Sequence, residues 1–277
     1  MKGIDVSDCQ GLINWKAVKN AGCEFAILRT TRGSGNPDKY LPTNIQGCLQ
    51  NGIRLSFYKY SYAKTQKAAV EEAEGVIYCL EKYGIQPSQD TIIWMDVEDK
   101  CQFALSTDAL TKIIKAWKNV IIENGFSFGL YMGKYYYEHG EVNIAELNDL
   151  AWIARYYNGN TAMRLSQTPD MRYAPKALSG QTLWGWQYSS KGKCDGISGN
   201  VDLDVSFIDF KPAIVEPSYY KTPEFGIVDG LNKIGVDSSY ANRKKIAEAN
   251  GIEKYKGTAE QNKNLYELLV NGELKTV

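Results

Sequence analysis

Residues 91 to 99 read Thr91-Ile92-Ile93-Trp94-Met95-Asp96-Val97-Glu98-Asp99, an apolar run that ends in three carboxylates. A short apolar run is typical of a strand in a parallel sheet, because both faces of such a strand are buried. Asp96 and Glu98 are two residues apart, so in an extended chain their side chains point the same way. Two converging carboxylates repel each other and lose solvation, so their pKa values separate. One protonated acid beside one ionised acid is the equipment for cleaving a glycosidic bond, whereas the alternatives are a solvated acidic loop or a divalent-metal site.

Two other strand-like segments, far away in the sequence, also carry acids. The first is the amino terminus, Met1-Lys2-Gly3-Ile4-Asp5-Val6-Ser7, and the second is Asn200-Val201-Asp202-Leu203-Asp204-Val205-Ser206-Phe207. One such segment alone would carry little meaning. Three in one domain predict a shared acidic cleft.

Strand-like and helix-like segments alternate along the first 210 residues. Helical periodicity and Gly stops predict helices over 15–20, 44–51, 68–83, 108–124 and 144–147. Strands are predicted over 25–30, 53–62, 128–132, 151–156, 183–188 and 201–207, besides the two at residues 1–7 and 91–97. This alternation indicates a parallel sheet, and about eight strands indicate a closed barrel with an irregular last part. In such barrels the active site lies at the carboxyl ends of the strands, where Asp5, Asp96, Glu98 and Asp202 are expected.

The composition excludes several classes of function. Lys plus Arg and Asp plus Glu both number 32, so no global field favours nucleic acid or anionic membranes. The single histidine, His139, disfavours a His-based metal site or a Ser-His or Cys-His mechanism, and we expect no metal and no cofactor. No apolar run is long enough for a transmembrane helix, and the start shows no signal peptide. The six dispersed cysteines are therefore expected to be reduced, in a cytosol.

Several motifs, in order, resemble glycoside hydrolase family 25, the N-acetylmuramidases of phages and bacteria, over roughly residues 1–210. They are Gly3-Ile4-Asp5-Val6-Ser7 with Gln10-Gly11 and Trp15, Asp96-Val97-Glu98, Trp152-Ile153-Ala154-Arg155-Tyr156, Trp186-Gln187-Tyr188-Ser189 and Gly199-Asn200-Val201-Asp202-Leu203-Asp204. The resemblance implies an irregular TIM-like (β/α) barrel that cleaves the β-1,4 bond between N-acetylmuramic acid and N-acetylglucosamine in peptidoglycan glycan strands. Retaining, inverting and substrate-assisted routes all stay open.

The resemblance also implies roles for four acids. Glu98 is the expected general acid, with a pKa raised by Asp96, and Asp96 is expected to stay ionised and to stabilise positive charge or orient the N-acetyl group. Asp5 and Asp202 are expected to tune the cluster from across the barrel. Family matching selects Asp202, although Asp204 shares its face by alternation. Lys59 stands where the family has His, on the face opposite to Tyr60, so we expect little catalytic consequence.

Aromatic residues are abundant, with 19 Tyr and 6 Trp. Aromatic rings pack on the apolar faces of sugars while their polar tips reach hydroxyls, although ordinary barrel packing is the alternative for any one of them. The predicted substrate-binding residues are Tyr60, Tyr62, Tyr131, Trp152, Trp186 and Gln187.

Residues 211–224 carry three prolines and no periodicity, which predicts a stiff linker. Helices are predicted beyond it over 225–233, 240–250 and 259–271, the last with a Thr258–Gln261 capping box. We interpret residues 225–277 as an all-α three-helix module that resembles the small carboxyl-terminal modules of phage endolysins. Binding to the bacterial cell wall is implied, and a homo-oligomerisation or stabilising role is the alternative. The basic run Arg243-Lys244-Lys245 is expected to be a solvated helix face.

Together these features predict a phage endolysin that resides in the host bacterial cytoplasm and reaches the wall after holin-mediated release. A bacterial autolysin without a signal peptide is the alternative origin. A carbohydrate-binding protein on an inactive barrel is the alternative function, and it would require the loss of a catalytic carboxylate. All four are present.

Overall fold

The computed structural model describes residues 1–33, 35–147, 149–178, 180–213, 219–220 and 226–277. The chain divides into two compact units, residues 1–214 and 215–277. The boundary between them falls inside the predicted linker, part of which lies outside the described residues. Each unit is described by itself.

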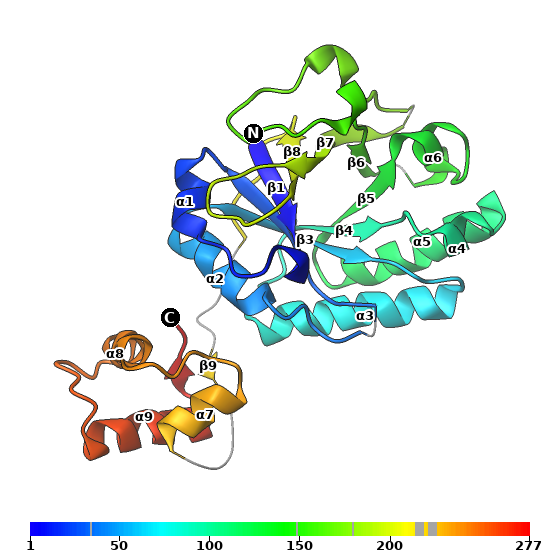
Figure 1. Ribbon diagram of the computed structural model, residues 1–277. Coiled ribbons are helices and arrows are strands. Elements are labelled where there is room, and N and C mark those ends of the chain that lie inside the picture. Colours follow the sequence, from blue (N-terminus) through cyan, green and yellow to red (C-terminus); the bar gives the residue numbers. More distant parts are fainter. Residues whose placement is uncertain (34, 148, 179, 214–218, 221–225) are drawn as a thin grey trace. The chain divides into compact units, whose positions relative to one another are not determined.

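The first unit is a closed barrel of eight strands in the order β1 to β8 (Figure 1). The strands are β1 (Lys2–Val6), β2 (Phe25–Arg29), β3 (Arg54–Tyr60), β4 (Ile92–Asp96), β5 (Ser127–Gly133), β6 (Leu150–Ala154), β7 (Thr182–Gly192) and β8 (Val201–Ser206). The predicted barrel is therefore confirmed.

The direction of the last strand corrects the expectation of a wholly parallel sheet. Strands β1 to β7 pair in parallel, whereas β8 pairs antiparallel with both β7 and β1. A parallel return needs a crossover of a dozen or more residues, usually a helix, and only residues 193–200 separate β7 from β8. The short connection therefore turns the chain back on itself.

Helices cover the outside of the barrel over its first two thirds. They are α1 (Trp15–Asn20), α2 (Leu41–Gln50), α3 (Gln66–Lys82), α4 (Lys100–Phe103), α5 (Thr107–Glu123) and α6 (Lys134–Glu138). Figure 1 shows the long helices α3 and α5 side by side. The helix predicted over 144–147 is only the short 3-10 helix η2 (Ile144–Glu146), and 3-10 turns replace helices between β6 and β7. The predicted irregularity of this last part is confirmed.

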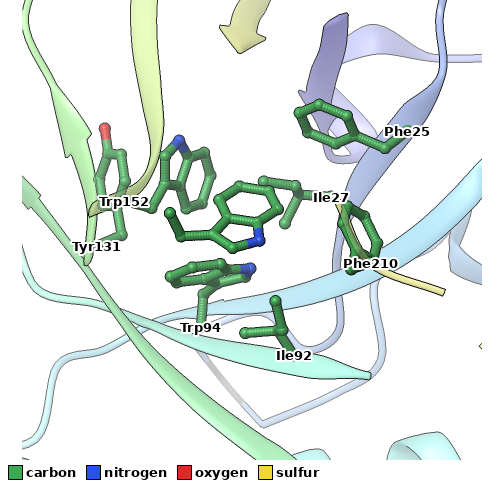
Figure 2. Close-up of a cluster of buried hydrophobic side chains, with 8 residues drawn as sticks. Phe25, Ile27, Ile92, Trp94, Tyr131, Trp152 and Phe210 are labelled. Carbon is green, nitrogen blue, oxygen red and sulfur yellow. The ribbon is translucent and has the colours of Figure 1, made fainter. Parts of the chain in front are cut away.

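Large aromatic side chains fill the barrel below its mouth (Figure 2). Trp94 lies against both Trp152 and Trp184, with ring centroids 5.7 and 4.7 Å apart. The Trp94 indole donates to Ser56 Oγ at 2.7 Å, so its polar atom is satisfied inside the core. A Cβ on Gly129 would lie 2.2 Å from the Trp94 ring, so only glycine allows β5 to approach. This packed layer is the floor under the acidic mouth.

The second unit contains the three predicted helices, α7 (Ile227–Lys233), α8 (Tyr240–Ala249) and α9 (Ala259–Asn271). The Thr258–Gln261 capping box is present, and Gly272 ends α9 in the left-handed conformation with φ 72°. The helices share one core that includes Leu231, Ile246, Leu265 and Leu269, each with 0% exposure. This core is what an independently folding module requires.

A short strand pair was not predicted for this unit. Strand β10 (Leu274–Lys275) pairs antiparallel with β9 (Tyr219–Tyr220), which lies within the residues predicted as linker. Of the predicted basic run, Arg243 is held inside the unit, because its guanidinium donates to Tyr255 Oη at 3.0 Å and to Ser238 O. Lys244 pairs with Glu248 along α8 at 4.0 Å, which fits an ordinary exposed helix face.

No helix among the described residues combines the length and the apolar character needed to cross a membrane.

Candidate active site

The predicted acids come from three strands that meet at one mouth of the barrel. Asp5 lies near the end of β1, Asp96 ends β4 and Glu98 follows it. Asp202 lies at the start of β8, not at a carboxyl end as predicted, and it reaches the same mouth because β8 runs antiparallel. Asp5 and Asp202 are paired directly across β1 and β8, so they are neighbours on the side of the closed barrel away from β4, which carries Asp96.

The charges of the four acids act on one another. Burial raises the pKa of Asp202 to about 6, and the charge of Glu98 adds to the rise. Burial raises the pKa of Asp5 well above its usual value, followed by the charges of Asp202 and Asp204. Asp5, Asp96, Glu98 and Asp202 therefore form one group of interacting carboxylates.

Asp96 and Glu98 differ in their exposure. Asp96 is 5% exposed, and its Oδ1 has no hydrogen-bond partner among the described residues, whereas Glu98 is exposed. Burial raises the pKa of Asp96 well above its usual value, with further increases from Glu98 and Asp202. Partial desolvation raises the pKa of Glu98, and the charge of Asp99 adds to the rise. The predicted repulsion between Asp96 and Glu98 is seen in the raised pKa of Asp96. In the free protein the pKa values of both carboxyls are therefore raised, that of Asp96 chiefly by its deep burial.

The charge of Lys59 acts on the carboxylate cluster although its side chain lies on the other face of β3. As predicted, it lies on the face of β3 opposite to Tyr60, but its side chain is only 2% exposed. Its ammonium donates to the Tyr60 carbonyl and lies 5.5 Å from the centre of the Tyr62 ring. Burial lowers the pKa of Lys59, while the charges of Glu72 and Asp96 raise it. In return Lys59 lowers the pKa of Asp96, so its charge bears on the site more than the sequence indicated.

A polar network lies directly below the mouth. Gln187 Nε2 donates to Asp5 Oδ2 at 2.8 Å, and Gln187 Oε1 accepts from Tyr131 Oη at 2.9 Å and Tyr156 Oη at 2.6 Å. Asp204 has 0% exposure and its Oδ1 accepts from Trp152 Nε1 at 2.8 Å. Asp202 is thus the acid at the mouth and Asp204 the acid beneath it, as family matching indicated.

The predicted substrate-binding residues occupy different depths. Tyr60 is half-buried and Tyr62 is 46% exposed, with their ring centroids 4.8 Å apart, so both are open to a ligand. Tyr131 and Gln187 belong to the buried network, with Tyr131 beside Trp152 in Figure 2. Trp152 and Trp186 are 1% and 0% exposed, which corrects the expectation that they contact sugar. Trp152 belongs to the packed aromatic layer below the mouth of the barrel, and Trp186 Nε1 donates to Arg155 O at 2.8 Å.

Asp99 and Tyr156 take part in the site but were not among the predicted site residues. Tyr60 Oη donates to Asp99 Oδ2 at 3.2 Å, which fixes Tyr60 beside the acids. Tyr156, 42% exposed, links the surface to Gln187. Both lie inside stretches that the sequence had already singled out. Asp99 lies beyond the end of β4, and Tyr156 lies beyond the observed end of β6 although the predicted strand over 151–156 included it. Among the described residues, no group of three or more acids, thiols or imidazoles is spaced to hold a metal ion.

Residues 4–197 match the family described as Glycosyl hydrolases family 25. The autolytic lysozyme of Clostridium acetobutylicum is 27% identical over 204 residues, which cover 74% of this chain and 55% of that protein. The chain thus spans about half the length of this relative. The crystal structure of a bacterial lysozyme from Streptomyces coelicolor aligns with a TM-score of 0.59 and 22% identity over 75% of this chain and 92% of that chain. A shorter match, 47% identical over 55 residues, is to the L-alanyl-D-glutamate peptidase of Listeria phage A118 and covers 20% of each protein.

Proposed function

Because the chain belongs to glycosyl hydrolase family 25, we propose that it hydrolyses the β-1,4 bond between N-acetylmuramic acid and N-acetylglucosamine in peptidoglycan. The observation that carries this proposal is the convergence of Asp5, Asp96, Glu98 and Asp202 at one mouth of the barrel. Their pKa values are raised, as cleavage of a glycosidic bond by a general acid requires near neutral pH.

Glu98 is the general acid in this proposal. Its side chain is exposed in the free protein, so a glycan strand laid across the mouth would remove its water. Loss of solvation favours the protonated form, and the pKa of Glu98 would rise further on binding. The acid would therefore be protonated when the glycosidic oxygen is beside it.

Asp96 is the acid that the substrate would ionise. Its Oδ1 has no partner among the described residues, and an acetamido N–H of the glycan is a donor of suitable chemistry. A hydrogen bond to the carboxylate lowers its pKa, and the buried charge of Lys59 acts in the same direction. Substrate binding would thus leave the proton on Glu98 and the charge on Asp96. The ionised Asp96 would then orient the N-acetyl group and stabilise the oxocarbenium-like charge.

Tyr60 and Tyr62 are the proposed sugar contacts. Their rings lie together at the mouth, and the hydrogen bond from Tyr60 to Asp99 sets the orientation of one of them. Sugar rings pack on such surfaces through their C–H faces.

The test is digestion of purified peptidoglycan followed by mass spectrometry of the fragments. We expect new N-acetylmuramic acid reducing ends, and Glu98→Gln should remove nearly all turnover while the unfolding transition stays in place. New N-acetylglucosamine reducing ends would contradict the assigned bond. Wild-type turnover by Glu98→Gln would contradict the assigned acid, and wall binding without cleavage by the wild type would favour a binding protein.

We further propose that the carboxyl-terminal unit binds the wall and that the protein is a phage endolysin. A peptidase and a glycosidase have different catalytic domains, so the 55-residue match to a phage peptidase is best explained by the second unit, which spans 215–277. A unit combined with unrelated bond-cleaving domains serves a need that those domains share, and the shared need is the wall. As an endolysin the protein would be made in the host cytoplasm and would reach the wall after holin-mediated release.

A fluorescent fusion of residues 219–277 tests the targeting role on isolated host walls. Decoration of the walls, together with weaker lysis by residues 1–213 than by the full chain, would support it. Absence of decoration, with unchanged lysis by residues 1–213, would favour a dimerisation role, which sedimentation of the fusion would reveal.

A further inference from the structure

Asp204 is a fully buried acid that the proposed reaction does not use. It lies on β8 opposite Gly3 of β1 on one side and opposite Gln187 of β7 on the other. Asp5, two residues after Gly3, therefore shares the interior face with Asp204 as its diagonal neighbour across an antiparallel pair. Side chains in this relation are within reach of each other. Gln187, the partner of Asp204 in register, donates to Asp5, which places all three side chains in one group.

The hydrogen bonds of this group leave one oxygen without a donor. Asp204 Oδ1 accepts from Trp152 Nε1, whereas Asp204 Oδ2 is buried and has no hydrogen-bond partner among the described residues. Asp5 Oδ2 accepts from Gln187. An ionised carboxylate only accepts, so two ionised acids cannot bond to each other, but a proton on Asp5 would supply the donor that Asp204 Oδ2 lacks.

We propose that Asp204 is a positioning residue that keeps Asp5 protonated by accepting its hydrogen bond, so that Asp5 enters the cleft as a neutral carboxylic acid. This inference rests on the proposed glycosidase function for its consequence and on the buried hydrogen-bond group for its geometry.

The surrounding groups favour one shared proton. Asp5 and Asp204 are both buried, with Asp202 beside them, and each of these conditions disfavours a second negative charge. The indole of Trp152 stabilises the charge on Asp204, and a hydrogen bond from Asp5 does the same. Tyr58, Tyr131 and Tyr156 are the phenols around this group, and burial raises the pKa of each. The proton therefore resides on Asp5 and the charge on Asp204.

The neutral Asp5 has a consequence for the reaction. A charged Asp5 beside Asp202 would repel an ionised Asp96. It would also attract the positive charge that forms on the sugar, in competition with the carboxylates at the mouth. A neutral Asp5 leaves that task to the carboxylates at the mouth. Activity should therefore fall as rising pH removes the shared proton, independently of the titration of Glu98.

The direct test is ¹³C NMR of the aspartate carboxyl carbons during a pH titration. Asp5→Asn should abolish one protonated resonance of the wild type. In Asp204→Asn the midpoint pH of that resonance's titration should fall by about one unit or more, because the new amide donates a hydrogen bond to Asp5 instead of accepting one from it. This readout needs no substrate, so it stays informative if the protein does not cleave walls.

The pH profile of kcat/KM supplies the second readout. Asp204→Asn should move the alkaline limb to lower pH, and Asp5→Asn, which has no proton to lose, should remove that limb's dependence on the pair. Trp152→Phe is the matched comparison, because it removes the hydrogen bond to Asp204 Oδ1 and leaves Asp204 Oδ2 able to accept from Asp5. It should move the limb to higher pH, since the charge on Asp204 loses its donor. If Asp204 only anchors Trp152, Asp204→Asn would leave the Asp5 resonance and the pH profile unchanged, and that result would overturn the proposal.

Discussion

Asp202→Asn should make the protein more stable at neutral pH than the wild type, and the gain should vanish in acid. The pKa of Asp202 in the folded protein is about 6. In an unfolded chain an aspartate titrates near about 3.9. A carboxyl with a raised folded pKa contributes stability below the unfolded pKa and loses that contribution as pH rises through the folded pKa. The window of the effect therefore lies between about pH 4 and pH 7.

The magnitude follows from the difference between the two pKa values. About two units correspond to about 3 kcal/mol of unfolding free energy. Asp202 is half-buried, so water at the mouth reduces this free energy. We expect the stability of Asp202→Asn relative to the wild type to increase by about 2 kcal/mol from pH 4 to pH 8. The neighbours act in the same direction, because Asp202 raises the pKa values of both Asp5 and Asp96.

The assay is urea unfolding followed by tryptophan fluorescence at several pH values. All six Trp residues lie in the barrel, so the signal reports that unit alone. Asp195→Asn is the matched control, because Asp195 is an exposed acid of the same unit with a side chain 74% accessible. A difference between Asp202→Asn and wild type that stays constant from pH 4 to pH 8 would refute the reasoning. It would mean that Asp202 titrates alike in the folded and unfolded chains.

Three further outcomes are expected. Lys59→Met should lower kcat about tenfold by removing the buried charge that favours ionised Asp96, whereas Lys16→Met, at an exposed position, should leave kcat unchanged in the same lysis assay. Tyr62→Ala should raise KM several-fold with little change in kcat, because a stacking contact of about 1 kcal/mol serves bound substrate and transition state alike, and an unchanged KM would remove Tyr62 from the cleft. Leu265→Ala should destabilise the second unit by about 2–5 kcal/mol, seen as lost helical circular dichroism on heating while the fluorescence transition of the barrel stays in place.

The barrel could be predicted because its signals are local. The apolar run before Asp96 and the periodic helices α3 and α5 each carry their own pattern, and their order along the chain fixes the topology up to β7. The direction of β8 depends on the length of a loop, not on the pattern of the strand. The sequence reasoning treated that strand like the others, and the short connection over residues 193–200 was the signal that could have corrected it.

The sequence predicted which residues gather at the site, but it did not predict how deeply each is buried or how its pKa is shifted. Alternation placed Asp96 and Glu98 on one side, yet it gives no depth, and depth decides how strongly burial raises the pKa of each acid. Trp152 and Trp186 read as sugar contacts because aromatic composition is the same for a floor and for a cleft. The contribution of Lys59 was underestimated because a strand's two faces were treated as electrically separate, whereas charge acts through a strand that is one residue thick.

The arrangement of the acids has a cost that the rest of the barrel must offset. Each raised pKa means that the fold holds a carboxyl in a place where its charged form is disfavoured, so the mouth opposes folding at neutral pH. The packed layer of Trp94, Trp152 and Trp184 lies directly below and supplies apolar burial at that same level. The layer does more than stabilise, because the Trp152 indole also supplies the hydrogen bond to Asp204. The floor of the barrel and the chemistry at its mouth are therefore parts of one structure, and a substitution such as Trp152→Phe should change stability and pH dependence together.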